Sequence, residues 1–210
     1  MTIERGEIHP DLAAEFPSLA LHWIQVGCGS GPSPRAVRDR LKEMSNRISG
    51  AKAVQMRQEA IPWAYRVFFR QVGIDPDERR TPVEEVVLDR LKHGGFRSRN
   101  LLDDAITIAT FETGVPIVAF DAERVQPPIG LRLAYPNELM GRGGRPLSSG
   151  QIVVADQERP VAVLFADLDP DCGVTPRTER MVLAVVQVEG VPDIAIEEAL
   201  WMVEEIVTGA

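Results

Sequence analysis

The stretch GVPIVAFD, residues 114–121, decides the fold class. An uncharged apolar run, interrupted by Pro116, follows a helix-ending glycine and closes on Asp121. A run of this kind, bounded by turn residues, indicates either a buried strand or the wall of a pocket. The sequence changes character across it, because helical periodicity dominates before it and strand-like segments dominate after it.

Four segments before this stretch have the spacing and the end signals of helices. The first follows Ser33 as a cap and Pro34 as its first residue, and it carries an apolar stripe at spacings of three and four. The third has Thr81 as its cap, and the fourth is capped by Asn100 and stopped by Gly114. The predicted helices cover residues 34–48, 62–73, 81–95 and 100–114, and a strand is predicted before them at residues 19–26.

Strand-like segments follow, and a final amphipathic helix, IAIEEALWMVEEIV, closes the chain. The predicted strands are IGLRLAY, QIVVAD, PVAVLFADLD and RMVLAVVQVEG. Helices first and strands second, without regular alternation, predict an α+β fold. With 210 residues, of which 44% are hydrophobic, we expect one compact unit overall. Within it, residues 1–60 form a strand and a basic helix that pack on a main domain of residues 61–210.

Composition excludes several classes of protein. No apolar run approaches the roughly 18 residues of a membrane span, and the first residues show no signal peptide, so we expect a cytoplasmic protein that does not contact membranes. Cys28 and Cys172 are too few and too far apart for a disulfide framework or a zinc site. We expect neither a metal nor another cofactor.

The net charge of −8 argues against DNA binding and against general nucleic-acid binding. The charge is unevenly distributed: residues 1–100 hold 16 Lys and Arg against 13 Asp and Glu, whereas residues 101–210 hold 7 against 18. A polyanion would therefore meet the first half. Its candidate contacts are Arg35, Arg38, Arg40 and Lys42, although a solvated helix face with local ion pairs explains them as well.

Eight motifs, taken in order, resemble one family. They are WAY (63–65), GIDP (73–76), RRTPVE (79–84), NLLDD (100–104), GVPIVAFD (114–121), LRLA (131–134), GQIVVAD (150–156) and VTPRT (174–178). Their order and spacing are similar to those of the B3/B4 domain of the bacterial phenylalanyl-tRNA synthetase β subunit, and still more to those of its freestanding relatives. The resemblance runs from about residue 63 to 190.

This resemblance implies a layered α+β domain with mixed or antiparallel sheets of unusual topology and helices packed on one side. In the synthetase, the pocket of this domain hydrolyses tyrosine wrongly attached to the phenylalanine tRNA. A positioned water can perform such ester hydrolysis if the developing oxyanion is stabilised, so a protein nucleophile is not required. The implied partners are a charged tRNA or an aminoacyl small molecule.

Two family residues are replaced in this chain. The synthetase pattern has a histidine just before Ala-Phe-Asp, where this chain has Val118. A family glutamate falls near Pro170, inside DLDPDCGV. The catalytic residues are therefore unknown, and Thr107 stands where the freestanding relatives often have asparagine.

The resemblance and the helix pattern together predict a pocket. Asn100 caps a helix, and Asp104 shares its face one turn later, either as a buried hydrogen-bond anchor or as a pocket wall. The candidate substrate-binding residues are Asn100, Asp104, Val115, Ile117, Val118, Phe120, Asp169, Thr175 and Thr178.

Several other polar groups can be explained by an ordinary structural role as well as by a functional one. Asp167, Asp169 and Asp171 alternate, which on an extended segment places three carboxylates on one side; they are exposed turn acids or a cation site. Neighbouring acids should raise the pKa of the Cys172 thiol, which argues against a nucleophile. The glycine-rich segment 141–145 is a hairpin turn or an anion cradle.

Three functions remain open. The first is recognition of the aminoacyl end of a charged tRNA, with hydrolysis of a mischarged ester in trans. The second is a binding module for an amino acid, another small molecule or tRNA, without catalysis. The third is a tRNA-dependent aminoacyl transferase.

Overall fold

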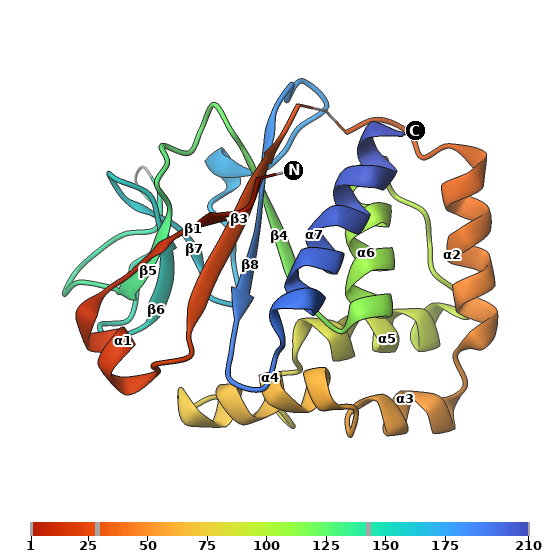
Figure 1. Ribbon diagram of the computed structural model, residues 1–210, viewed down its shortest axis with the longest axis horizontal. Coiled ribbons are helices and arrows are strands. Elements are labelled where there is room, and N and C mark those ends of the chain that lie inside the picture. The colour runs from red at the N-terminus through yellow and green to blue at the C-terminus, as the bar shows by residue number, and fades with distance from the viewer. Residues whose placement is uncertain (1, 28–29, 142–143, 210) are drawn as a thin grey trace. The chain divides into compact units, whose positions relative to one another are not determined.

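The computed structural model describes residues 2–27, 30–141 and 144–209. Within them the chain forms an α+β fold with seven α-helices and two four-stranded sheets (Figure 1). The helices are α1 (Pro10–Glu15), α2 (Arg35–Arg47), α3 (Gly50–Met56), α4 (Ala60–Gln71), α5 (Pro82–His93), α6 (Leu101–Thr113) and α7 (Asp193–Thr208). The strands are β1 (Glu4–Arg5), β2 (Glu7–Ile8), β3 (Ala20–Val26), β4 (Ile117–Asp121), β5 (Gly130–Leu133), β6 (Ile152–Ala155), β7 (Pro160–Val163) and β8 (Met181–Gln187).

The chain divides into two compact units. The sheet unit comprises Met1–Gly29 and Val118–Gln187, and the helical unit comprises Ser30–Ile117 and Val188–Ala210. Each unit is therefore built from two separate stretches of sequence. The division of the chain at residue 60 stays a prediction.

The N-terminal residues contribute strands to both sheets. The first sheet has the order β1-β3-β8-β4, and β3 pairs antiparallel with β8 along its whole length, from Ala20 opposite Gln187 to Val26 opposite Met181. The second has the order β2-β5-β6-β7 and is mixed, because β2 runs parallel to β5 while β5, β6 and β7 pair antiparallel. Gly6 joins β1 to β2 where a Cβ atom would lie 2.4 Å from a backbone oxygen, so only glycine fits this crossing.

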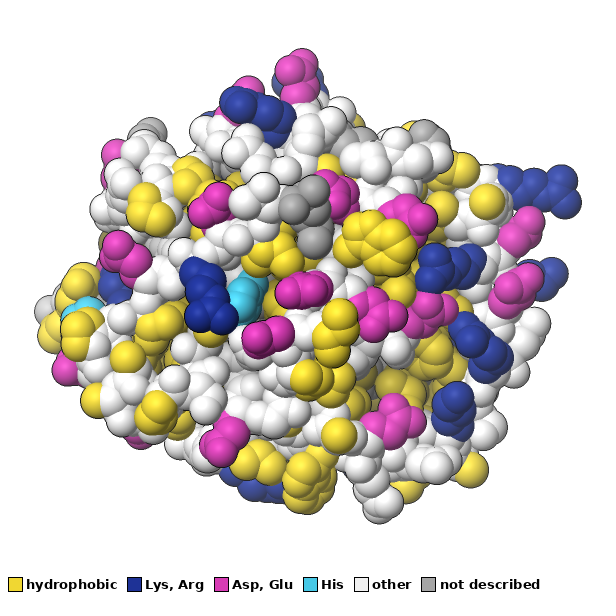
Figure 2. All heavy atoms as spheres, viewed as in Figure 1, with side chains coloured by type: hydrophobic (Ala, Val, Ile, Leu, Met, Phe, Trp, Pro, Cys, Tyr) yellow, Lys and Arg dark blue, Asp and Glu magenta, His cyan; other side chains and the backbone are white. Residues whose placement is uncertain are grey.

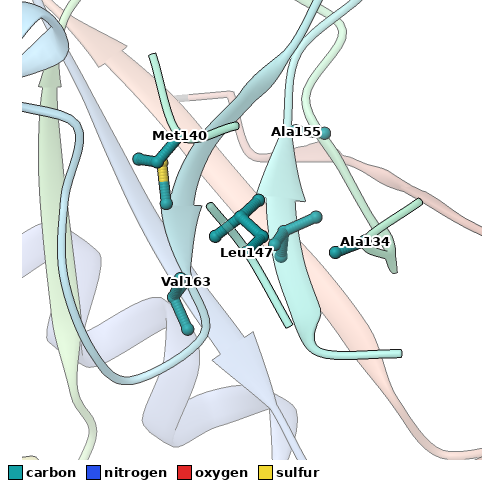
Figure 3. Packing of buried hydrophobic residues seen from close by; sticks show 6 residues of the cluster. Ala134, Met140, Leu147, Ala155 and Val163 are labelled. Atoms are coloured by element: carbon teal, nitrogen blue, oxygen red, sulfur yellow. The ribbon is translucent and has the colours of Figure 1, made fainter. Parts of the chain in front are cut away.

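Apolar side chains fill the space beside the second sheet. Met140 and Leu147, from the loop after β5, pack against Val153 of β6 and Val163 of β7 (Figure 3). All four are at most 5% exposed. The long connection between β5 and β6 is thus held by the core.

In the helical unit, α6 lies between α2 and α7 (Figure 1). Ala105 and Ala109 of α6 and Ala199 of α7 are completely buried, and such small side chains let neighbouring helices approach closely. The predicted stripe of α2, formed by Val37, Leu41, Met44 and Ile48, is buried as expected. No helix among the described residues is both long and apolar enough to cross a membrane.

Two details of the predicted helices are wrong. Ser33 does not cap α2; the cap position is Pro34, and the Ser33 hydroxyl donates instead to Asp104. Helix α4 begins at Ala60, so Pro62 lies inside the first turn, where a missing N–H costs nothing.

Candidate functional site

The predicted cap and anchor at the start of α6 form one hydrogen-bonded group. The Asn100 Oδ1 accepts from the Asp103 N–H at 2.9 Å, which caps the helix, and from the Ser30 hydroxyl at 2.8 Å. Asp104 is only 2% exposed. Its carboxylate accepts from the Ser33 and Ser98 hydroxyls, each at 2.5 Å, and from the Arg99 N–H at 2.9 Å. We call Ser30, Ser33, Ser98, Arg99, Asn100 and Asp104 the Asp104 cluster.

The Asp104 cluster fixes the loop between α5 and α6. The loop runs from Gly94, the left-handed C-cap of α5, to Asn100, the N-cap of α6. The Phe96 N–H donates to the Ser45 hydroxyl at 2.8 Å, and the Arg99 N–H is held by Asp104. Two backbone positions within this short loop are thus tied to buried side chains.

A groove opens in the helical unit beside this loop. Its volume is about 550 Å³, and its walls come from α5, α6, the loop and the residues just before and at the start of β4. The lining residues are Arg80, Pro82, Glu85, Val86, Leu88, Asp89, Lys92, Phe96, Arg97, Arg99, Ile106, Thr107, Thr110, Pro116 and Ile117. We call it the Thr107 groove.

The Thr107 groove combines an apolar lining, hydroxyl groups and a cationic rim. Ile106, Pro116 and Ile117 are among its apolar residues, and Thr107 and Thr110 supply hydroxyls. Four of its lining residues are cationic and two, Glu85 and Asp89, are acidic. Such a surface suits a ligand with an apolar part and an anionic part.

The apolar candidate residues differ in exposure. Val115 and Phe120 are completely buried, whereas Ile117 and Val118 are half-buried. Ile117 lines the Thr107 groove. Val115 and Ile117 belong to the helical unit, and Val118 and Phe120 belong to the sheet unit.

In the sheet unit, the two candidate threonines join the aspartate that ends β4. The buried Thr178 hydroxyl donates to the Asp121 carboxylate at 2.5 Å and accepts from the Thr175 N–H at 3.0 Å. The two threonine hydroxyls lie 3.3 Å apart. Asp121 also accepts from the Glu123 N–H at 2.9 Å. We call Asp121, Thr175 and Thr178 the Thr178 network.

An open depression of about 520 Å³ lies beside this network. It is lined by Asp121, Glu123, Arg124, Pro170, Asp171, Gly173, Thr175, Pro176 and Arg177. Thr175 is exposed, so its hydroxyl is available to a ligand or a water. This depression and the Thr107 groove lie in different units.

The three alternating aspartates do not share one side, which corrects the prediction for DLDPD. Asp167 and Asp171 are exposed, but Asp169 is 3% exposed and forms an ion pair with Arg159. The chain bends here into a 3-10 turn, Pro170–Cys172, whose first N–H groups need a cap, and Asp169 provides it. Gly141 packs against the same carboxylate at φ +66°, where a Cβ would lie 2.6 Å from Oδ1.

Among the described residues, no group of three His, Cys, Asp or Glu side chains could hold a metal ion. Burial raises the pKa of the Cys172 thiol to about 11; the Asp169 carboxylate adds to the rise, and the Arg159 guanidinium opposes it. The predicted direction of this shift is correct, although burial is the larger cause. Cys28 and residues 142–143 of the glycine-rich segment lie outside the described residues.

The four candidate tRNA contacts lie on α2. On the face shown in Figure 2, Lys and Arg side chains over this helix alternate with acidic ones. Arg35 pairs with Asp39, Arg38 donates to the Ser33 carbonyl, and Arg40 pairs with Glu112 at 2.5 Å. Lys42 is exposed.

The sequence interpretation did not single out Lys92, Arg97 and Arg99. The available signal was the segment LKHGGFRSRN, in which three cations surround a helix stop and the next helix cap. Only the folded loop shows that all three line the Thr107 groove.

Comparison with known proteins gives a match to one family model and to three relatives. The model of the B3/4 domain family matches residues 64–198. The phenylalanine–tRNA ligase beta subunit of Xanthomonas euvesicatoria is 34% identical over 114 residues, which is 53% of this chain and 14% of that protein. The same subunit of Xylella fastidiosa is 34% identical over 94 residues, 43% of this chain and 12% of that protein, and that of Dechloromonas aromatica is 28% identical over 107 residues, 50% and 14% respectively. The matched segment thus spans a small part of each relative.

Proposed function

The chain belongs to the B3/4 domain family, and from this premise we propose that it binds the aminoacylated 3′ end of a tRNA or a similar aminoacyl compound. The matched relatives are subunits of a tRNA ligase by name. This chain covers 14% or less of each of those subunits, so their whole activity does not transfer to it. The proposal therefore concerns binding of one end of the tRNA.

The observation that carries this proposal is the composition of the Thr107 groove. An aminoacylated adenosine end has an amino-acid side chain, ribose hydroxyls and a phosphate at its 5′ side. The groove offers apolar residues such as Ile106 and Ile117, the Thr107 hydroxyl, and cations at its rim. Its volume of about 550 Å³ lies within the range of about 300–1,000 Å³ that is usual for small-ligand sites.

The other candidate residues have supporting roles in this proposal. Asn100 and Asp104 hold the groove's loop through the Asp104 cluster. Val115 and Phe120 are buried and contribute packing. We therefore assign ligand contact in the helical unit to Ile117 and Thr107.

Ester hydrolysis is the second candidate function, and the Thr178 network favours it. The exposed Thr175 hydroxyl is linked through Thr178 to a carboxylate, so it could orient a water for attack on an ester carbonyl. Against this, the candidate carboxylates are engaged: Asp104 accepts three hydrogen bonds, and Asp169 pairs with Arg159. Binding is therefore the better supported function.

The test is a thermal-shift titration with an aminoacyl-adenosine analogue whose ester is replaced by a stable amide. At a concentration of 100 Kd, a ligand stabilises the folded protein by about 2.7 kcal/mol. For a chain of this length, that corresponds to a rise in Tm of about 5–11 °C. A set of analogues with different side chains would identify the preferred amino acid.

Two variants assign the binding to one unit. Thr107→Phe fills the groove and should abolish the shift, whereas Thr175→Val changes the depression of the sheet unit and should leave the shift intact. The proposal fails if no analogue at millimolar concentration shifts the wild-type Tm, or if Thr107→Phe folds and still binds normally. Deacylation of charged tRNAs, assayed with the same variants, decides the second candidate: turnover that Thr175→Val abolishes would support hydrolysis.

A further inference from the structure

Three cations at the rim of the Thr107 groove have no ion-pair partner among the described residues. Lys92 at the end of α5 and Arg97 and Arg99 in the following loop are exposed and line the groove. Within the described part of the chain, none of their side chains forms an ion pair or a side-chain hydrogen bond. A fourth rim cation, Arg80, is paired with Asp77 at 3.2 Å.

The arginines of α2 differ in this respect. Arg35 pairs with Asp39, Arg40 pairs with Glu112, and Arg38 donates to a backbone carbonyl at 2.9 Å. A guanidinium that already has an acceptor gains less from a phosphate, because the first interaction must be given up or shared. Among the described residues, three unpaired cations therefore gather at the groove, whereas α2 holds one, Lys42, although α2 carries more positive charge in the sequence.

The loop that carries Arg97 and Arg99 is held in place before any ligand arrives. The Ser45 hydroxyl accepts from the Phe96 N–H at 2.8 Å, and Asp104 accepts from the Arg99 N–H at 2.9 Å. Ser98, between the two arginines, donates to Asp104 at 2.5 Å. Because the backbone is already ordered, binding pays less conformational entropy.

From these observations we infer that Lys92, Arg97 and Arg99 form a phosphate clamp for a single-stranded RNA 3′ end, which leads the terminal nucleotide into the Thr107 groove. The inference rests on the proposed function for the identity of the ligand and adds the site of its phosphates. The acidic lining residues, Glu85 and Asp89, precede Lys92 along α5, so the phosphates bind at the end of α5 and along the loop. A single strand suits a groove of about 550 Å³, which has room for a small ligand and none for a duplex.

The test measures the salt dependence of RNA binding. The probe is a fluorescently labelled 12-nucleotide RNA that ends in CCA and carries no amino acid. Its binding is measured at salt concentrations from 50 to 200 mM. Two variants remove the same number of charges: Lys92→Gln, Arg97→Gln and Arg99→Gln together at the clamp, and Arg35→Gln, Arg38→Gln and Lys42→Gln together on α2. Their melting temperatures confirm that both fold.

Each phosphate contact on a single strand contributes about −0.7 to the slope of log K against log salt. The clamp variant should lose about 2 from the magnitude of this slope and should bind at least tenfold more weakly at 50 mM salt. The α2 variant should keep the wild-type slope. A clamp variant with an unchanged slope, or a loss that appears in the α2 variant instead, would overturn the inference.

Two further experiments distinguish an RNA clamp from a general anion site, and failure of the clamp from failure of the proposed function. AMP and inorganic phosphate, used as competitors, should displace the RNA only at concentrations far above its own; equal potency would mean that the rim is a general anion site and not an RNA clamp. The aminoacyl-adenosine amide carries no phosphate, so it should stabilise the clamp variant as much as the wild type. If it does so while RNA binding fails in the wild type, the clamp is wrong and the proposed function stands.

Discussion

Replacing Asp104 tests the structural basis of the groove. Its carboxylate accepts three hydrogen bonds, and the donors differ in exposure: Ser33 is 4% exposed, whereas Ser98 and Arg99 lie at the surface. In Asp104→Ala the buried Ser33 hydroxyl loses its acceptor, which costs about 1–3 kcal/mol. The two exposed donors can turn to water, so each loses only a net hydrogen bond of about 0.5–1.5 kcal/mol. We expect a total loss of about 4 kcal/mol in the free energy of unfolding.

Asp104→Asn should cost less, about 1–2 kcal/mol, because the amide oxygen can keep the Arg99 N–H and the amide nitrogen can donate to a serine hydroxyl that rotates to accept. The assay is thermal unfolding followed by circular dichroism. A loss of about 4 kcal/mol lowers the Tm of a chain of this length by about 8–16 °C. Asp103→Ala is the matched control, since half-buried Asp103 accepts only from the Asn100 side chain at 2.9 Å. If Asp104→Ala melts within 1 °C of the wild type, or if Asp103→Ala is the more damaging change, the Asp104 cluster does not hold the loop.

Three further predictions concern other parts of the chain. Gly114→Ala should destabilise the fold more than Gly94→Ala. Both glycines have φ near +75°, but of the two only Gly114 would place a Cβ 3.1 Å from a proline ring. Paired urea titrations measure the difference in the free energy of unfolding, and equal losses would show that this contact is unimportant. In the Cys28→Ser variant, Cys172 should resist a thiol reagent at pH 8 until the protein unfolds, because burial raises the pKa of its thiol to about 11. Prompt labelling of the folded protein would contradict this. The Arg132 guanidinium lowers the pKa of Glu138. The pair therefore stabilises the fold above the ordinary glutamate pKa and loses that contribution as pH falls through the lowered value. Glu138→Gln should flatten the acid side of the plot of unfolding free energy against pH, and an unchanged plot would refute this.

Local chemistry predicted the helix ends well where a cap needs only its near neighbours. Thr81 and Glu84 form the two halves of a capping box at the start of α5, and Asn100 caps α6 as expected. Gly94 and Gly114 end these helices in the left-handed conformation that glycine adopts without strain. In each case the signal and its partner lie within a few residues of each other.

The sequence failed where the partner is distant or the element is short. Ser33 is a good cap by type, but its hydroxyl bonds Asp104, 71 residues away, and that contact cannot be read from local spacing. Helices α1 and α3 have six and seven residues, which is less than two full turns, so their periodicity is weak, and neither was predicted. The sheet order could not be predicted either, because it depends on which strands meet in space.

The family could be predicted from the sequence, whereas the candidate site residues stay a prediction that the structure only locates. The family assignment from ordered motifs is confirmed by the matched model over residues 64–198. Thr107 and Ile117 were both noted in the sequence, and both line the groove. The prediction that Asp167, Asp169 and Asp171 share one side is wrong, since burial of Asp169 beside Arg159 depends on a 3-10 turn that alternation in the sequence does not predict.

The central claim is that the Thr107 groove holds the aminoacyl end of the ligand, and a crystal structure of the protein soaked with the aminoacyl-adenosine amide tests it most directly. We predict that the ligand lies in this groove, with its amino-acid side chain against Ile106 and Ile117 and its 5′ side toward Arg97 and Arg99. Density for the ligand in the depression of the sheet unit, with the groove empty, would contradict the account.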